Sequence, residues 1–437
     1  MKLRIAETAW DALKAQLLAR EDVETAGILL GRHVGTGAGE AVAVEHSFAL
    51  PDEAYRVRRP DQISIDPVAL NRLTRPARDH GLSIFTIHTH PSAREAWFSA
   101  ADDAGDSRLM PSLSCQVPRV PHGSLVLASS GAVAARSFTP TGQIRDVDLQ
   151  VVGRTTMGSA MRPVQTESWH ARQELALGAG GQARLRHLRL AVVGLGGIGS
   201  VVAMQLAHLG VGELVLIDGD VVETSNVSRI VGARMTDLDK AKVEVAARYA
   251  SNLGFARQVE CVGQFLSPEH EALFASCDIV VSCVDRMTPR ALLNRWAYRH
   301  LVPVVDLGVA FRVDGSAKIV ADAGRVVVIG PGRPCLACWG HLDPNELRRE
   351  AQSEEDRARD VAAGYLEGVE EPQPSVMAFN THVAGAGVIE VMRLATGFAG
   401  TDSPPLRIAF SFSDGTVRRN SLAGIHACKI CSRHRDP

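Results

Sequence analysis

At 437 residues the chain is too long for one ordinary hydrophobic core, so we expect at least two domains. A hydrophobic fraction of 46% with 22% charged residues is typical of globular proteins, and a formal net charge of −2 gives no electrostatic basis for binding nucleic acid or an acidic membrane surface. The first residues lack the pattern of a signal peptide and no uncharged apolar run of about 18 residues occurs, so we expect a soluble, cytoplasmic protein without a membrane span.

The first part of the chain contains short strands and helices in mixed order. Apolar spacing predicts helices over residues 7–20 and 67–80. Apolar and β-branched runs predict strands over 26–30, 41–44, 83–87, 124–128 and 132–138. We therefore expect a mixed α/β domain over residues 1–148, followed by a linker over 149–168 where periodicity is lost.

From residue 188 onwards, strands and helices alternate regularly. Strands are predicted over 190–193, 214–217, 259–262 and 278–283, and helices between them over 200–209, 239–253 and 268–276. Such alternation is typical of a doubly wound parallel sheet that binds ligands at the carboxyl ends of its strands. We expect this second domain to cover residues 169–437. Residues 343–375 contain ten acidic and four basic side chains, which predicts a partly disordered crossing loop.

The first domain contains a set of candidate metal ligands. His88 and His90 lie two residues apart at the end of a predicted strand, so their imidazoles face the same side. Asp102 supplies a third ligand for Zn²⁺ and leaves the fourth position open for water, as a catalytic zinc site requires. Glu24 is the candidate general base and Ser99 the candidate hydrogen-bond donor to a developing oxyanion. Each residue alone fits a structural role equally well, so the prediction rests on the set.

The segments 24–31, 88–91 and 98–102 resemble the motifs of the JAMM (JAB/MPN) metalloprotease family. Members of that family cleave peptide or isopeptide bonds after the C-terminal glycine of ubiquitin-like proteins. The resemblance covers about residues 1–140 and implies an active zinc hydrolase, with a degenerate scaffold as the alternative. One departure is that eight residues separate His90 from Ser99, one more than in the usual family pattern.

A glycine-rich turn follows the first predicted strand of the second domain, and an acid, Asp218, follows the next strand. The glycines are Gly194, Gly196, Gly197 and Gly199. This pattern is typical of a helix N-terminus whose backbone amides approach phosphates while the acid binds a ribose. Taken alone, it fits a nicotinamide or flavin enzyme equally well.

Charged and polar residues beyond the glycine turn favour an adenylating enzyme. They are Asp220, Asn226, Arg229, Lys242 and Asp285. Adenylation needs such charges because negative charge builds on the α-phosphate while pyrophosphate departs. The region from about residue 169 to the end of the chain resembles the ThiF/MoeB/E1 superfamily, whose members adenylate the C-terminal glycine of ubiquitin-like proteins and have a Rossmann-like fold.

This second resemblance implies ATP and Mg²⁺ as ligands. It implies that the glycine turn holds the phosphates, that Asp218 holds the ribose, and that Asp220 and Asp285 lie near magnesium. The residues implied to contact the triphosphate are Asn226, Arg229 and Lys242. Arg172 is expected to reach ATP across a homodimer interface, as the corresponding residue does in relatives.

Four of the eight cysteines form two Cys-x-x-Cys pairs, Cys335/Cys338 and Cys428/Cys431. Together the pairs offer four thiolates to one tetrahedral Zn²⁺ ion and leave no position for water, so we expect a structural site. Two separate redox motifs are the alternative. Both pairs also belong to the resemblance with the ThiF/MoeB/E1 superfamily.

Larger E1 enzymes carry a nucleophilic cysteine, but the segment 343–375 contains none. We interpret Cys261, Cys277 and Cys283 as core thiols because their neighbours are strand-like or helical. The chain is therefore expected to stop at an acyl adenylate or to pass the glycine to a partner's thiol or to a sulfur donor.

Together, the two signatures predict a bifunctional enzyme for a ubiquitin-like or sulfur-carrier protein. The first domain would cleave after the C-terminal glycine of that protein, and the second would join the exposed carboxylate to AMP. An E2-like protein or a sulfur donor is a further expected partner. Three alternatives stay open: activation of a ThiS/MoaD-like carrier for small-molecule biosynthesis, one domain serving only as a binding module, and generic nicotinamide binding.

Overall fold

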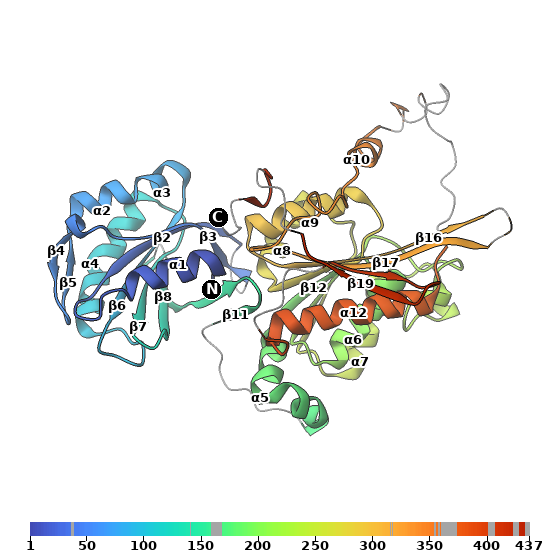
Figure 1. Ribbon diagram of the computed structural model, residues 1–437, viewed down its shortest axis with the longest axis horizontal. Coiled ribbons are helices and arrows are strands. Elements are labelled where there is room, and N and C mark those ends of the chain that lie inside the picture. Colours follow the sequence, from blue (N-terminus) through green and yellow to red (C-terminus); the bar gives the residue numbers. More distant parts are fainter. Residues whose placement is uncertain are drawn as a thin grey trace. The chain divides into compact units, whose positions relative to one another are not determined.

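The computed structural model describes residues 1–35, 39–139, 141–158, 168–314, 316, 318–353, 355–356, 359, 374–400, 407–422 and 428–432. The chain divides into two compact units, one formed mainly by residues 1–162 and the other mainly by residues 163–435. Each unit is built around a β-sheet with helices packed on it (Figure 1). Within the described ranges, no helix has the length and apolar character needed to cross a membrane.

The described residues of the first unit form a nine-stranded mixed sheet in the order β11-β10-β1-β3-β2-β6-β7-β8-β9. Its strands are β1 (Lys2–Ala6), β2 (Ala26–Val34), β3 (Ala41–Ala49), β6 (Ser83–His90), β7 (His122–Ala128), β8 (Val133–Phe138), β9 (Ile144–Asp146), β10 (Asp148–Val152) and β11 (Thr156–Gly158). A separate two-stranded sheet consists of β4 (Tyr55–Arg58) and β5 (Ile63–Ile65).

Helices cover both faces of the nine-stranded sheet. One face packs against α1 (Glu7–Leu17), and the other packs against α2 (Pro67–Leu73), α3 (Arg75–His80) and α4 (Ala100–Gln116). The helix predicted over residues 67–80 is therefore two helices. Pro76 lies in the first turn of α3, where its missing N–H prevents the hydrogen-bond ladder of α2 from continuing.

The segment predicted to be a linker begins inside this sheet. β10 pairs in parallel with β1, and β11 pairs antiparallel with β10. Leu149 and Val152 are buried, so this segment contributes to the core of the first unit. The linker predicted from residue 149 thus starts about ten residues too early, and residues 159–167 lie outside the described residues.

The described residues of the second unit form an eight-stranded sheet in the order β14-β13-β12-β15-β16-β17-β18-β19. Its strands are β12 (Arg189–Val193), β13 (Glu213–Ile217), β14 (Gln258–Val262), β15 (Ile279–Ser282), β16 (Val304–Val313), β17 (Ile319–Ile329), β18 (Arg407–Ser411) and β19 (Thr416–Asn420). The first five strands of this order pair in parallel, which confirms the doubly wound prediction. The last three extend the sheet by antiparallel pairing.

Alternate residues of the parallel strands face two helical layers, because side chains of a strand alternate between the faces of a sheet. On one side, Leu190 and Val192 pack with α5 (Ala171–His187), α6 (Gly197–His208), α7 (Lys242–Leu253) and α12 (Met377–Thr396). On the other side, Ala191 and Val193 pack with α8 (Glu271–Ser276) and α9 (Met287–Arg299) (Figure 1). The carboxyl ends of β12, β13 and β15 consequently meet at one edge of this layer.

The predicted crossing loop contains a short helix, α10 (Pro344–Glu350). Asp343 caps this helix by accepting a hydrogen bond from the N–H of Asn345, at 2.8 Å. Most of the remaining loop, residues 354, 357–358 and 360–373, lies outside the described residues.

Candidate active sites

Strand β6 and helix α4 bring the three predicted zinc ligands together. The Nε2 atoms of His88 and His90 are 3.2 Å apart. Nε2 of His88 lies 3.0 Å from Oδ1 of Asp102, and Nε2 of His90 lies 3.6 Å from Oδ2. Ligand atoms bound tetrahedrally to zinc at about 2.0–2.1 Å are separated by roughly 3.3 Å. The donor types and their spacing therefore fit one zinc ion.

The N-terminus of α4 fixes the carboxylate of Asp102. Ser99 Oγ accepts a hydrogen bond from the N–H of Asp102 (3.2 Å), and Asp102 Oδ2 accepts one from the N–H of Ser99 (2.7 Å). Burial opposes ionisation of Asp102, but hydrogen bonds from His88 and Ser99 outweigh it and lower the pKa of the carboxyl. Ser99 Oγ accepts in this pair, and a serine hydroxyl can also donate a hydrogen bond.

Glu24 lies beside the imidazoles, just before β2. Its Oε1 is 4.0 Å from Nε2 of His90, and only 6% of the residue is exposed. Burial raises the pKa of Glu24 to about 7, against a smaller lowering by His88. A general base is most effective when its pKa is near the working pH. The backbone around Glu24 is fixed to β6 because the N–H of Thr25 donates to Thr89 Oγ1 (2.8 Å) and the N–H of Thr89 donates to the Thr25 carbonyl (2.9 Å).

Trp97 also lies at this site, although no motif indicated it. Its ring contacts the ring of His90 edge-on, with centroids 5.6 Å apart, and 52% of the residue is exposed. An exposed aromatic side chain in this position adds an apolar wall next to the metal-binding group.

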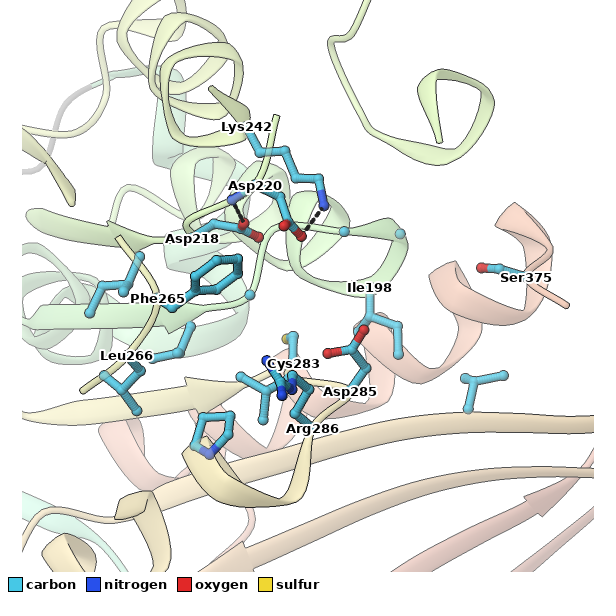
Figure 2. Close-up of a pocket in the computed structure, with 18 of the residues that line it drawn as sticks. Ile198, Asp218, Asp220, Lys242, Phe265, Leu266, Cys283, Asp285, Arg286 and Ser375 are labelled. Carbon is cyan, nitrogen blue, oxygen red and sulfur yellow. Dashed lines mark hydrogen bonds and ion pairs between the residues drawn. The ribbon is translucent and has the colours of Figure 1, made fainter. Parts of the chain in front are cut away.

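In the second unit, a cavity of about 410 Å³ opens at the carboxyl ends of β12, β13 and β15 (Figure 2). Gly194, the first residue after β12, has a φ of +86°, which favours glycine. A Cβ atom on Gly199 would overlap the carbonyl oxygen of Gly194. The turn therefore requires glycine at both positions, and it places the N-terminus of α6 at the cavity wall. Such a helix end attracts phosphate.

Asp218, the residue after β13, is buried at this wall. Its carboxylate accepts hydrogen bonds from the N–H groups of Leu195 (2.5 Å) and Asp220 (2.8 Å). Burial raises the pKa of Asp218, whereas the two N–H donors lower it. The carboxylate thereby joins the glycine turn to the loop that follows β13.

Charged residues surround the rest of the cavity. Nζ of Lys242, at the start of α7, lies 2.8 Å from Oδ2 of Asp220 (Figure 2). Arg229 and Asp285 also line the cavity, together with Gly194, Gly196 and Gly197. The structure thus brings most of the predicted nucleotide-binding residues to one place.

Three predicted residues do not line the cavity. Gly199 packs behind the glycine turn. Asn226 is buried, and its Oδ1 accepts a hydrogen bond from the N–H of Glu223 (2.8 Å), so it holds the turn that carries Arg229. Arg172 is exposed on α5. Its contact with ATP across a homodimer interface stays a prediction.

Several cavity residues come from segments that no motif indicated. Phe265 and Leu266 form an apolar side of the cavity (Figure 2), and Asn380 lies against the glycine turn, where a Cβ on Gly197 would overlap its amide. Glu350, the last residue of α10, accepts hydrogen bonds from the N–H groups of Met287 and Thr288, both at 2.8 Å. It therefore caps α9 at the cavity wall.

The four cysteines of the two Cys-x-x-Cys pairs converge in the second unit. Sγ of Cys335 lies 3.7 Å from that of Cys338 and 3.6 Å from that of Cys428, and the Sγ atoms of Cys338 and Cys431 are 3.6 Å apart. Four thiolates at about 2.3 Å from one zinc ion are separated by roughly 3.8 Å. The cluster fits a four-cysteine zinc site, as predicted.

The other thiols differ in their surroundings. Cys277 is buried, as expected for a core thiol. Cys283 lines the cavity, but burial raises its pKa well above the usual range, which disfavours the nucleophilic thiolate. Cys261 is exposed, so its interpretation as a core thiol is wrong; it lies on β14, an edge strand of the sheet.

Comparison with known proteins identifies both halves of the chain. The model of the ThiF family matches residues 170–428, and the model described as prokaryotic homologs of the JAB domain matches residues 6–140. The "Adenylyltransferase and sulfurtransferase uba4" of Aspergillus niger is 34% identical over 163 residues, which are 37% of this chain and 34% of that protein. The "SAMP-activating enzyme E1" of Haloferax volcanii is 36% identical over 164 residues, which are 37% of this chain and 57% of that protein.

These matches span less than two thirds of the length of either relative. Among solved structures, a crystal structure of Escherichia coli MccB with MccA-N7isoASN has a TM-score of 0.50 and 19% identity, over 62% of this chain and 75% of that one. At this identity the likeness concerns the fold alone.

Replacing Gly199 by Ala tests the glycine turn. The added methyl group overlaps the Gly194 carbonyl, so the turn and the helix end must shift. We expect Gly199→Ala to weaken ATP binding at least about tenfold in calorimetric titration, equivalent to about 1.4 kcal/mol. Gly180→Ala is the matched control, because a Cβ there meets no atom within 4 Å. Equal ATP affinity for both variants would contradict this account of the turn.

Replacing Cys431 by Ser tests the four-cysteine cluster. Cys431 is fully buried, and loss of one thiolate removes a corner of the metal site. We expect the zinc content to fall and the second unit to melt at lower temperature. A decrease of about 2 kcal/mol in the free energy of unfolding corresponds to a decrease of roughly 4–8 °C in the melting temperature of a unit of this size. Cys115→Ser, at an exposed thiol, is the control. If Cys431→Ser has the same zinc content and melting temperature as this control, the four-cysteine site is excluded.

Proposed function

This chain belongs to the ThiF family, and from that premise we propose that its second unit adenylates the C-terminal glycine of a ubiquitin-like or sulfur-carrier protein. In this reaction a carboxylate oxygen of the glycine attacks the α-phosphate of ATP. A carboxyl–AMP anhydride forms, and pyrophosphate leaves. The two relatives described above carry names that include adenylyltransferase and activating enzyme E1, which supports this reaction class.

The cavity beside the glycine turn carries this proposal. It combines a helix N-terminus for phosphates, the fixed carboxylate of Asp218 for a ribose, and two cations, Arg229 and Lys242, for charge that develops during the reaction. Asp220 and Asp285 offer carboxylate oxygens of the kind that Mg²⁺ prefers. Generic nicotinamide binding does not account for these paired acids and cations.

For the first unit we propose hydrolysis of the peptide or isopeptide bond that follows the same glycine. His88, His90 and Asp102 would hold zinc, which supplies a Lewis acid that activates water. Glu24 would accept the proton of that water and deliver it to the leaving amine, and Ser99 would donate a hydrogen bond to the developing oxyanion.

A narrower version of the proposal is activation of a carrier for sulfur transfer. The name of the Aspergillus relative includes sulfurtransferase, which favours this version. The adenylation step is identical in both cases, so the difference lies in the acceptor, an E2-like protein or a sulfur donor. A homodimer through the second unit, with Arg172 reaching the partner's ATP, is part of the proposal.

Paired substitutions separate the two activities. Glu24→Ala removes the proposed base. We therefore expect the cleavage rate of a β-grasp protein that carries extra residues after its C-terminal glycine to fall by about 10²-fold or more, with ATP–pyrophosphate exchange unchanged. Asp285→Ala should reduce the exchange by about 10²-fold or more and leave cleavage intact. Glu21→Ala, an exposed acid near Glu24 in sequence, is the control and should retain both activities. Loss of both activities in one folded single variant would mean that the two reactions share one centre.

A further inference from the structure

Arg136 is a buried arginine in the first unit that neither the motifs nor the proposed chemistry uses. It projects from β8 and is 9% exposed. Its Nη1 lies 2.5 Å from Oδ1 of Asp103, and its Nη2 lies 2.7 Å from Oδ2 of Asp106. Ser124 of β7 donates to the same Asp106 oxygen at 2.5 Å. The guanidinium therefore joins the sheet to the first two turns of α4.

The same guanidinium also contacts the residue before the helix cap. Cζ of Arg136 lies 3.8 Å from the centroid of the Phe98 ring, a cation–π contact. Phe98 and Asp103 lie on either side of the segment from Ser99 to Asp102. Arg136 thus holds both ends of the segment that contains the cap and the third metal ligand.

The start of α4 has no buried apolar side chain to hold it on the sheet. Its buried residues are Asp106, Met110 and Leu113, so apolar anchoring begins only in the third turn. Gly105, inside the helix, weakens helix formation further. Because the ligand-bearing turn buries no apolar side chain, polar contacts with the sheet position it. Besides the contacts of His88 with Asp102 and of Ser124 with Asp106, these are the ion pairs of Arg136.

We propose that Arg136 is the positioning residue of the first site: it holds the start of α4 on the sheet and thereby sets Asp102 opposite His88 and His90. This inference rests on the proposed zinc-binding function of the first unit. Partners that orient metal ligands typically change metal affinity by about 10–100-fold when they are replaced. Lysine would not substitute, since it lacks the planar fork that reaches two carboxylates at once.

Metal affinity tests the proposal without relying on activity. Cobalt(II) is titrated into metal-free full-length protein: the four-cysteine site gives thiolate charge-transfer absorption, whereas the histidine–aspartate site gives only weak visible bands. The variants are Arg136→Lys and the double variant Arg136→Met with Asp106→Leu, which removes both charges so that no buried carboxylate is left unpaired. For both, we expect about 10–100-fold weaker cobalt binding at the histidine–aspartate site and unchanged binding at the cysteines.

Arg4→Met is the matched control, because Arg4 is also a buried arginine of the first unit. Arg4 lies on β1, and its Nε donates a hydrogen bond to Gln150 of β10 at 3.0 Å. It should keep the cobalt affinity of the unchanged protein. Wild-type affinity in folded Arg136→Lys, or in the folded double variant, would overturn the inference. If the double variant does not fold, Arg136→Lys decides. If the unchanged protein binds no cobalt at the histidines, the proposed hydrolytic function fails and the inference fails with it.

Discussion

Two carboxylates held by backbone N–H groups organise the candidate sites. Asp102 accepts a hydrogen bond from Ser99 N–H, and Asp218 accepts from Leu195 and Asp220 N–H. A buried carboxylate needs such charge-assisted bonds to stay ionised. Because the donors belong to the backbone, the helix start after β6 and the glycine turn after β12 determine where each acid points. The positions of the candidate metal ligands and of the cavity are therefore consequences of where strands end.

Much of both sites is local in sequence, and that part was predictable. The alternation of His88 and His90 along one strand and the spacing of the glycines after another depend on backbone geometry alone. Helix α4 was not predicted, because Gly105 and Pro111 lie inside it and few of its residues are buried and apolar, so its periodic signal is weak. Arg136 replaces that missing apolar contact, and only the folded chain reveals it.

The remaining cavity wall could not be predicted because it comes from distant segments. Phe265 follows β14, Asn380 lies in the first turn of α12, and Glu350 is the last residue of α10. These three residues are too far apart in the sequence to form a motif. The resemblance also assigned a phosphate contact to Asn226, whereas the structure has it holding a turn. The pairing of β10 with β1 and of β17 with β18 was missed for the same reason, because these partners are remote in sequence.

Both proposed reactions act on one chemical group, the terminal glycine of another protein. The most direct test is intact-mass analysis of a small β-grasp protein with a short extension after its glycine, incubated with this enzyme, zinc, magnesium and ATP. The account predicts loss of the extension, followed by addition of AMP to the shortened protein. An enzyme that leaves the mass of every such protein unchanged, while transferring hydride to a nicotinamide nucleotide, would contradict it.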